Sequence, residues 1–90
     1  MNKQNIDEWR AEIDNIDKEL VRLLDRRAEL VKAIGTAKKK SRLAIRDVDR
    51  ERKVVGKALS ASNGSFPPEA LRKLFIWLLD VCVTIERKQL

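Results

Sequence analysis

The chain has 90 residues, a formal net charge of +6 and no histidine. Its single cysteine, Cys82, excludes an internal disulfide, and the lack of histidine makes a structural zinc site a poor fit. No apolar run reaches the length of a signal-peptide core or a membrane span, so we expect a protein of the cytoplasm. We also expect that it needs no metal and no other cofactor. The positive charge favours anionic partners of some kind.

The first predicted helix runs from about residue 5 to residue 40. Asn5 can cap it, and Glu8 stands three residues on, as in a capping box. Apolar residues then recur at alternating spacings of three and four, an apolar seam formed by Ile6, Trp9, Ile13, Ile16, Leu20, Leu23, Leu30, Ile34 and Ala37. Such a helix is about 50 Å long, whereas a compact domain of this size is roughly 30 Å across. We therefore expect the seam to pack against a second copy of the chain.

Two shorter helices are predicted after the periodicity breaks at residues 41–45. Asp47 can cap the second helix, about residues 47–60. The third, about residues 68–88, starts at Pro68, which suits a first helical position, and carries a stripe formed by Leu71, Leu74, Phe75, Leu78, Cys82 and Ile85. We expect no strand and no linker, so residues 1–90 are predicted to form one all-α domain with a long, a short and a medium helix.

A charged residue, Arg27, occupies the apolar seam between Leu23 and Leu30. Burying a charge is costly unless it is paired or meets a ligand. Lys38 lies eleven residues on and returns to within about 20° of the same face of the helix. Both cations can therefore face one cavity, although each also has a plainer interpretation, as a register-setting or solvent-reaching side chain.

Three charged residues share one face of the second predicted helix. Asp47, Arg50 and Glu51 stand at positions i, i+3 and i+4, and the plainer interpretation is a helix cap with surface salt bridges. In the third helix, Glu86 follows Cys82 by four residues and so lies beside the apolar stripe. It either points inward or belongs to a solvated helix end.

Taken together, these residues resemble the all-helical, type II chorismate mutases over nearly the whole chain. The matching segments are Ile13-Asp14, Ile16-Asp17, Leu23-Leu24-Asp25-Arg26-Arg27, Gly35-Thr36-Ala37-Lys38 and Ile45-Arg46-Asp47-Val48-Asp49-Arg50-Glu51. The resemblance implies an intertwined homodimer of three-helix chains, six helices in all, with two identical active sites. Its implied activity is the conversion of chorismate to prephenate in phenylalanine and tyrosine biosynthesis.

The resemblance also implies roles for individual cations. Arg27 and Arg10 of the second chain would clamp the substrate carboxylates, and Lys38 would bind a carboxylate and the ether oxygen. Arg10 and Arg27 of one chain are seventeen residues apart, about 25 Å along a helix and roughly 100° around it, so a shared site needs two chains. Arg50 would line the cationic side of the pocket.

The acidic residues of the matching segments are implied to orient the substrate. Asp47 and Glu51 would bind its ring hydroxyl, and Glu86 would contact the ether oxygen from the side away from the lysine. Many bacterial relatives have glutamine in place of Glu86, and Cys82 stands where relatives often have a small hydroxyl residue. Because a carboxylate would repel negative charge growing on the ether oxygen, we expect Glu86 to act in its protonated form.

Three alternatives stay open at this point. An isochorismate pyruvate-lyase has the same fold, but that subfamily tends to lack the acidic pair Asp47 and Glu51. A basic nucleic-acid-binding dimer agrees with the net charge, yet stacking aromatics and a reading helix are missing from the sequence. A non-catalytic helical dimer domain would not need its full set of cations. We therefore expect chorismate as ligand, no nucleic-acid or membrane partner, and either a separate enzyme of the same pathway or a fusion to one.

Overall fold

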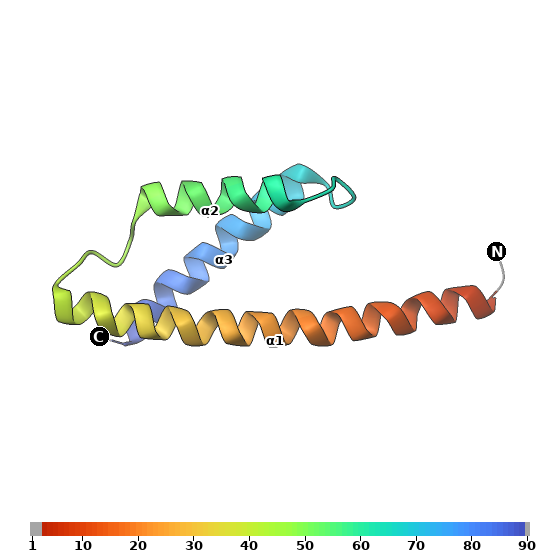
Figure 1. Cartoon of the computed structure of the whole chain (residues 1–90), viewed down its shortest axis with the longest axis horizontal. Helices are drawn as coiled ribbons and strands as arrows, with labels where there is room; N and C mark the ends of the chain where they lie inside the picture. The colour runs from red at the N-terminus through yellow and green to blue at the C-terminus, as the bar shows by residue number, and fades with distance from the viewer. Residues whose placement is uncertain (1–2, 90) are drawn as a thin grey trace. The chain divides into compact units, whose positions relative to one another are not determined.

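A computed structural model describes the backbone of residues 3–89 and the side chains of residues 5–89. It contains three helices, α1 (Lys3–Ser41), α2 (Val48–Ala61) and α3 (Pro68–Lys88), and no strand within the described range (Figure 1). The predicted all-α class and the order of long, short and medium helices are confirmed. The predicted cap at Asn5 is wrong, because α1 starts two residues earlier and Asn5 lies in its first turn.

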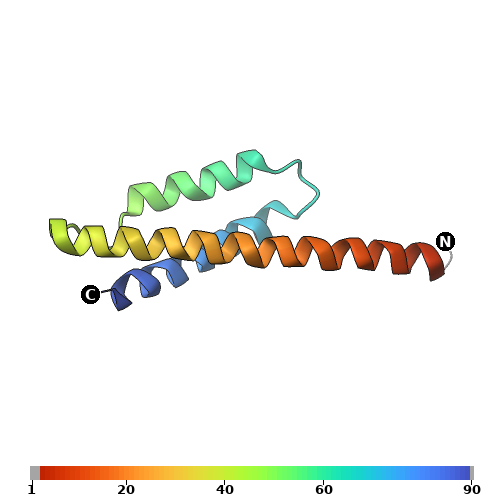
Figure 2. The same cartoon turned by 60° about the horizontal axis from the view of Figure 1, so that its bottom comes forward.

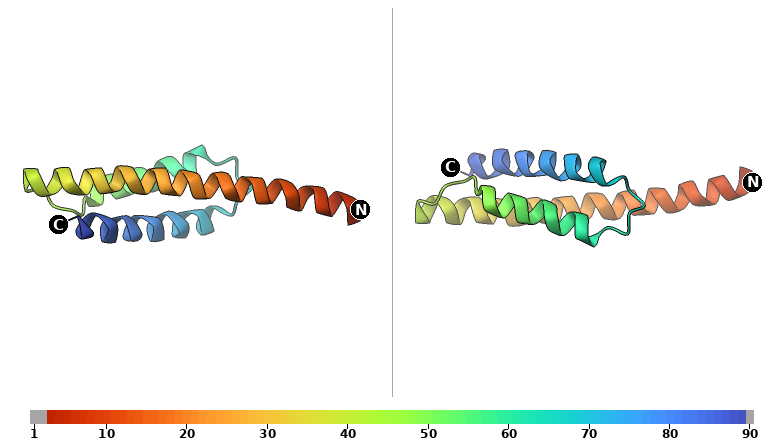
Figure 3. Two further views of the ribbon diagram at one scale, coloured as in Figure 1. Left: turned by 90° about the horizontal axis from the view of Figure 1, so that it is seen from below. Right: turned by 90° about the horizontal axis from the view of Figure 1, so that it is seen from above.

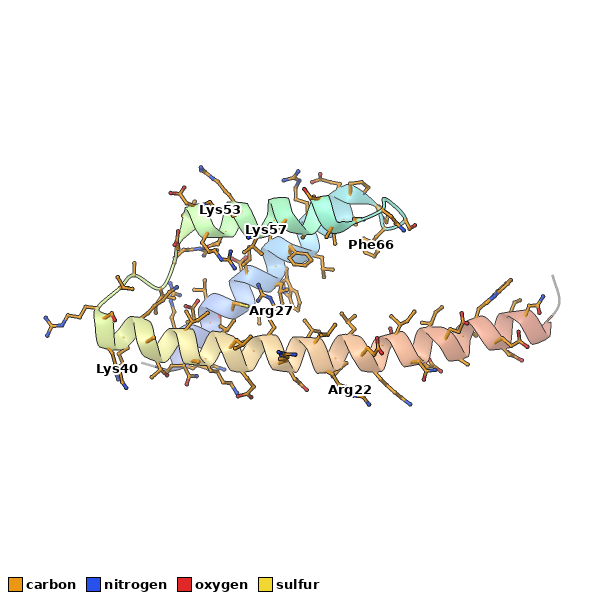
Figure 4. All side chains as sticks on the ribbon, in the orientation of Figure 1. Arg22, Arg27, Lys40, Lys53, Lys57 and Phe66 are labelled. Carbon is orange, nitrogen blue, oxygen red and sulfur yellow. The ribbon has the colours of Figure 1, made fainter. Side chains whose placement is uncertain are left out.

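The chain divides into two compact units, residues 1–30 and residues 31–90. The first unit is the N-terminal part of α1, and a single helix offers nothing that could cover its own apolar seam. Trp9, Ile16 and Leu23 are accordingly 46%, 61% and 62% exposed. Figure 4 shows that Arg22 and Arg27 leave this helix on different sides, as expected for residues five positions apart. No helix in the described part of the chain has the length and apolarity that crossing a membrane requires.

The second unit contains the C-terminal part of α1 together with α2 and α3. Residues 62–67 turn the chain back, so that α3 runs in the opposite direction to α2 and packs against it (Figures 2 and 3). The small core of this unit is formed by Val31, Val55, Leu79, Cys82 and Val83. The cysteine is thus part of the core.

The end of α1 and the start of α2 are both capped. Arg42 adopts φ 55° after α1, and the Leu43 N–H donates to the Lys38 carbonyl at 2.9 Å, which is the Schellman arrangement. Asp47 caps α2 as predicted, because its Oδ1 accepts a hydrogen bond from the Arg50 N–H at 3.1 Å. Pro68 begins α3, where the missing N–H costs nothing.

A glycine allows α1 and α3 to approach closely. A Cβ atom on Gly35 would lie 2.9 Å from the Glu86 Cα atom and 3.0 Å from the Glu86 carbonyl oxygen. Both neighbours are backbone atoms, so no side-chain rotation could relieve these contacts. The close approach brings the last turns of α3 beside the stretch of α1 that carries Lys38.

Candidate active site

The ammonium group of Lys38 is held between two acceptors. Its Nζ atom donates to the Ile45 carbonyl at 2.5 Å and lies 2.8 Å from Glu86 Oε1. The side chain of Lys38 is only 20% exposed. The position of this cation is therefore defined by the α1–α2 connection on one side and by α3 on the other, which is the kind of preorganisation that a charge-stabilising site needs.

Glu86 is the one charged residue among the buried residues that the structure describes. Its Oε1 atom is inaccessible to solvent, and no donor within the described residues reaches it with hydrogen-bond geometry, so the contact with Lys38 is an ion pair only. Cys82, one turn earlier on α3, is buried too. The expectation that Glu86 points inward is confirmed, and the interpretation as a solvated helix end is wrong.

The charged residues predicted on one face of the second helix lie at the start of α2. Asp47 uses its side chain to accept from the backbone of Arg50, whereas the side chain of Arg50 is exposed. Glu51 is half-buried and its backbone N–H donates to the Asp47 carbonyl at 3.0 Å. The capping interpretation of Asp47 therefore holds, and a direct side-chain contact with a ligand would compete with the cap.

One residue of this region has contacts that sequence reasoning missed. Arg46 binds Glu51 through two hydrogen bonds of 2.9 Å, from Nε and from Nη2, and its Nη2 also donates to Asp80 Oδ1 at 2.6 Å. These bonds raise the pKa of the Arg46 guanidinium above its usual range, mainly through Glu51 and then through Asp80. Arg46 lies outside α2, so helical spacing could not have paired it with either carboxylate.

Two predicted site residues belong to the first unit. Arg10 and Arg27 both lie on α1 within residues 1–30, whereas Lys38, Asp47, Arg50, Glu51, Cys82 and Glu86 lie within residues 31–90. The structure therefore brings Lys38 together with Glu86, and Lys38 also lines one pocket with Asp47 and Arg46. The participation of the two arginines in the same pocket stays a prediction.

The chemistry available in the second unit is that of charge stabilisation. An ammonium group held by two acceptors can bind an anionic oxygen, and a buried carboxyl group beside it can exchange a hydrogen bond with the same ligand. Neither group is arranged as an activated nucleophile. A small carboxylate whose reaction develops negative charge on oxygen would suit this arrangement.

Comparison with known proteins agrees with this chemistry. Residues 9–87 match the protein family described as chorismate mutase type II. The bifunctional chorismate mutase/prephenate dehydratase of Aquifex aeolicus is 39% identical over 89 residues, which cover 94% of this chain and 25% of that protein. The protein of the same name from Neisseria gonorrhoeae is 35% identical over 88 residues, which cover 93% of this chain and 24% of that protein. The chain thus spans about a quarter of the length of these relatives.

A solved structure shows the same likeness over nearly its whole length. The chorismate mutase (form II) of Thermus thermophilus is 32% identical and superimposes with a TM-score of 0.89, covering 94% of this chain and 97% of that one. The form I structure from the same organism gives a TM-score of 0.81 at 32% identity and covers 87% and 98% of the two chains. The chain therefore belongs to the chorismate mutase type II family.

Proposed function

We propose that this chain catalyses the rearrangement of chorismate to prephenate, as part of phenylalanine and tyrosine biosynthesis. The observation that carries the proposal is the fixed, largely buried ammonium group of Lys38, held 2.5 Å from the Ile45 carbonyl oxygen and 2.8 Å from Glu86. The family match over residues 9–87 supplies the substrate class. Chorismate carries two carboxylates and an ether oxygen, which are the groups that such a cation binds.

The reaction needs no nucleophile and no proton transfer to the protein. The bond between the ring and the ether oxygen breaks while a carbon–carbon bond forms in the same step, and negative charge grows on that oxygen. Catalysis then comes from holding the substrate in its reactive conformer and from donors aimed at the oxygen. Lys38 would supply the main donor, and Glu86 would contact the ether oxygen from the side away from the lysine.

The remaining site residues are assigned by the same proposal. Arg27 and Arg10 of a second chain would bind the two carboxylates, and Arg50 would add positive charge to the pocket. Asp47 and Glu51 would bind the ring hydroxyl, Asp47 through the backbone at the start of α2 because its carboxylate already caps the helix. Cys82 would line the pocket without taking part in the chemistry.

We further propose that residues 1–90 act as a single domain and form an intertwined homodimer of six helices. The support is the exposed apolar seam of residues 1–30, where Trp9, Ile13, Ile16, Leu20, Leu23 and Leu30 are 46–62% exposed. A seam this long on one helix needs a partner, because large contiguous apolar surfaces are rare on monomers. Sedimentation equilibrium should give twice the chain mass, and a monomer at micromolar concentration would overturn this part.

The metabolic setting follows from the proposed reaction. Relatives from Aquifex aeolicus and Neisseria gonorrhoeae are named as chorismate mutases joined to a prephenate dehydratase. We therefore expect the product to pass to a prephenate-consuming enzyme, whether separate or joined to this chain. We place the reaction in the cytoplasm, where the one buried thiol, Cys82, would stay reduced.

The experiment that tests the proposal follows the loss of chorismate absorbance and identifies the product. Prephenate should form with wild-type protein, and the rate should fall by about 10²-fold or more in Lys38→Ala. Lys40→Ala is the matched control, because it removes the same charge from an exposed position two residues on. Turnover of isochorismate to pyruvate and salicylate, with none of chorismate, would replace the mutase by the lyase.

A further inference from the structure

Arg46 joins three parts of the second unit. It lies in the connection between α1 and α2. Its guanidinium donates hydrogen bonds of 2.9 Å to both carboxylate oxygens of Glu51 on α2 and one of 2.6 Å to Asp80 on α3. The Arg46 side chain is 46% exposed, whereas that of Glu51 is 21% exposed. The two bonds to Glu51 are a fork-to-carboxylate pair, the geometry in which arginine fixes both the position and the plane of a carboxylate.

The two hydrogen bonds from Arg46 leave Glu51 able to accept from a further donor. Each carboxylate oxygen has two acceptor sites, and the fork uses only one on each oxygen. A hydroxyl group approaching from the other side would meet a carboxylate whose rotation is already restricted. Without Arg46, the half-buried Glu51 side chain would sample several rotamers and would lose the charge that balances it.

We propose that Arg46 is a positioning residue that holds Glu51 in the orientation needed to bind the ring hydroxyl of the substrate, with Asp80 as the second anchor on α3. This inference rests on the proposed function, and in particular on the proposed role of Glu51. In this role Arg46 acts through the carboxylate of Glu51 and through the link that it makes between α2 and α3.

The proposal predicts that loss of Arg46 changes KM much more than kcat. The ring hydroxyl takes no part in the bonds that break and form, so its hydrogen bond contributes equally to the ground state and the transition state. Loss of Arg46 should therefore raise KM by roughly tenfold, the usual effect of losing a hydrogen bond to a charged group, and change kcat by less than about twofold. Asp80→Asn should raise KM by only about two- to threefold, because the fork to Glu51 remains.

The experiment compares Arg46→Ala, Arg46→Lys and Glu51→Ala on two substrates, chorismate and its analogue in which the ring hydroxyl is replaced by hydrogen. On chorismate, Arg46→Ala should raise KM, and Arg46→Lys should rescue only part of the loss, because lysine keeps the charge but not the fork. On the deoxy analogue, all three variants should match wild type. Circular dichroism of each variant verifies that the helices are intact.

Arg52→Ala is the matched control, since it removes an exposed arginine of α2 whose ion-pair partner is Asp49 at 4.0 Å. It should leave both constants unchanged. An equal loss on the two substrates, or an unchanged KM in Arg46→Ala, would overturn the positioning role while leaving the proposed reaction in place. Absence of chorismate turnover by wild-type protein would overturn the proposed function, and the positioning role with it.

Discussion

Replacing Gly35 by alanine tests the close approach of α1 and α3 that sets the position of Glu86. The new Cβ atom would lie 2.9 Å from the Glu86 Cα atom, whereas ordinary carbon contacts begin at about 3.5 Å. The helices must therefore separate by roughly 0.6 Å or more. Overpacking of this kind costs about 1–3 kcal/mol, and the better helix propensity of alanine offsets about 1 kcal/mol of it.

Gly56→Ala provides the matched control, because a Cβ atom there meets nothing within 4 Å. It should raise the free energy of unfolding by up to about 1 kcal/mol, so the two variants should differ by about 1–3 kcal/mol. Urea denaturation at one protein concentration measures this difference. Gly35→Ala should also lower kcat, since misplacement of a reacting contact by about 1 Å can cost up to about 10²-fold. Equal stability of the two variants, with full activity of Gly35→Ala, would refute the reasoning.

Three further variants test other parts of the account. Lys38→Arg keeps the charge but cannot place one compact donor between the Ile45 carbonyl and Glu86, so kcat in the chorismate assay should fall by about tenfold or more. A rate equal to wild type would contradict the role of the ammonium group. Glu86→Gln places a hydrogen-bond donor of similar size beside Lys38, so kcat should stay within about threefold of wild type or rise, and a fall of about tenfold or more would count against a donor at this position. Arg42→Gly should raise the melting temperature by a few degrees, because glycine adopts φ 55° without strain, and a lower melting temperature would show that the side chain has another role.

The helices could be predicted from the sequence because the local signals agree. The spacing of the apolar seam, the cap at Asp47 and the proline at residue 68 each indicate a helix or one of its ends, and the structure has helices at these places. The start of α1 was predicted two residues late, since the capping signal at Asn5 is overridden and the helix extends to Lys3.

The candidate site could be predicted only where its residues lie on the helices. Lys38 and Glu86 were found by their positions on helical faces, but their ion pair depends on how α1 and α3 approach at Gly35, which helical periodicity does not describe. The contacts of Arg46 were missed for a related reason. Its partners lie five and thirty-four residues away, and the residue itself belongs to an irregular connection, for which spacing has no rule.

The most direct test of the account mixes two variants that should each be inactive, Arg10→Ala and Arg27→Ala. If each active site takes Arg10 from one chain and Arg27 from the other, a mixed dimer has one intact site and one that lacks both arginines. Chains that are unfolded together and refolded at equal concentration should therefore regain about a quarter of the wild-type rate of prephenate formation. Absence of recovery, although mass spectrometry detects mixed dimers, would contradict a shared chorismate mutase site.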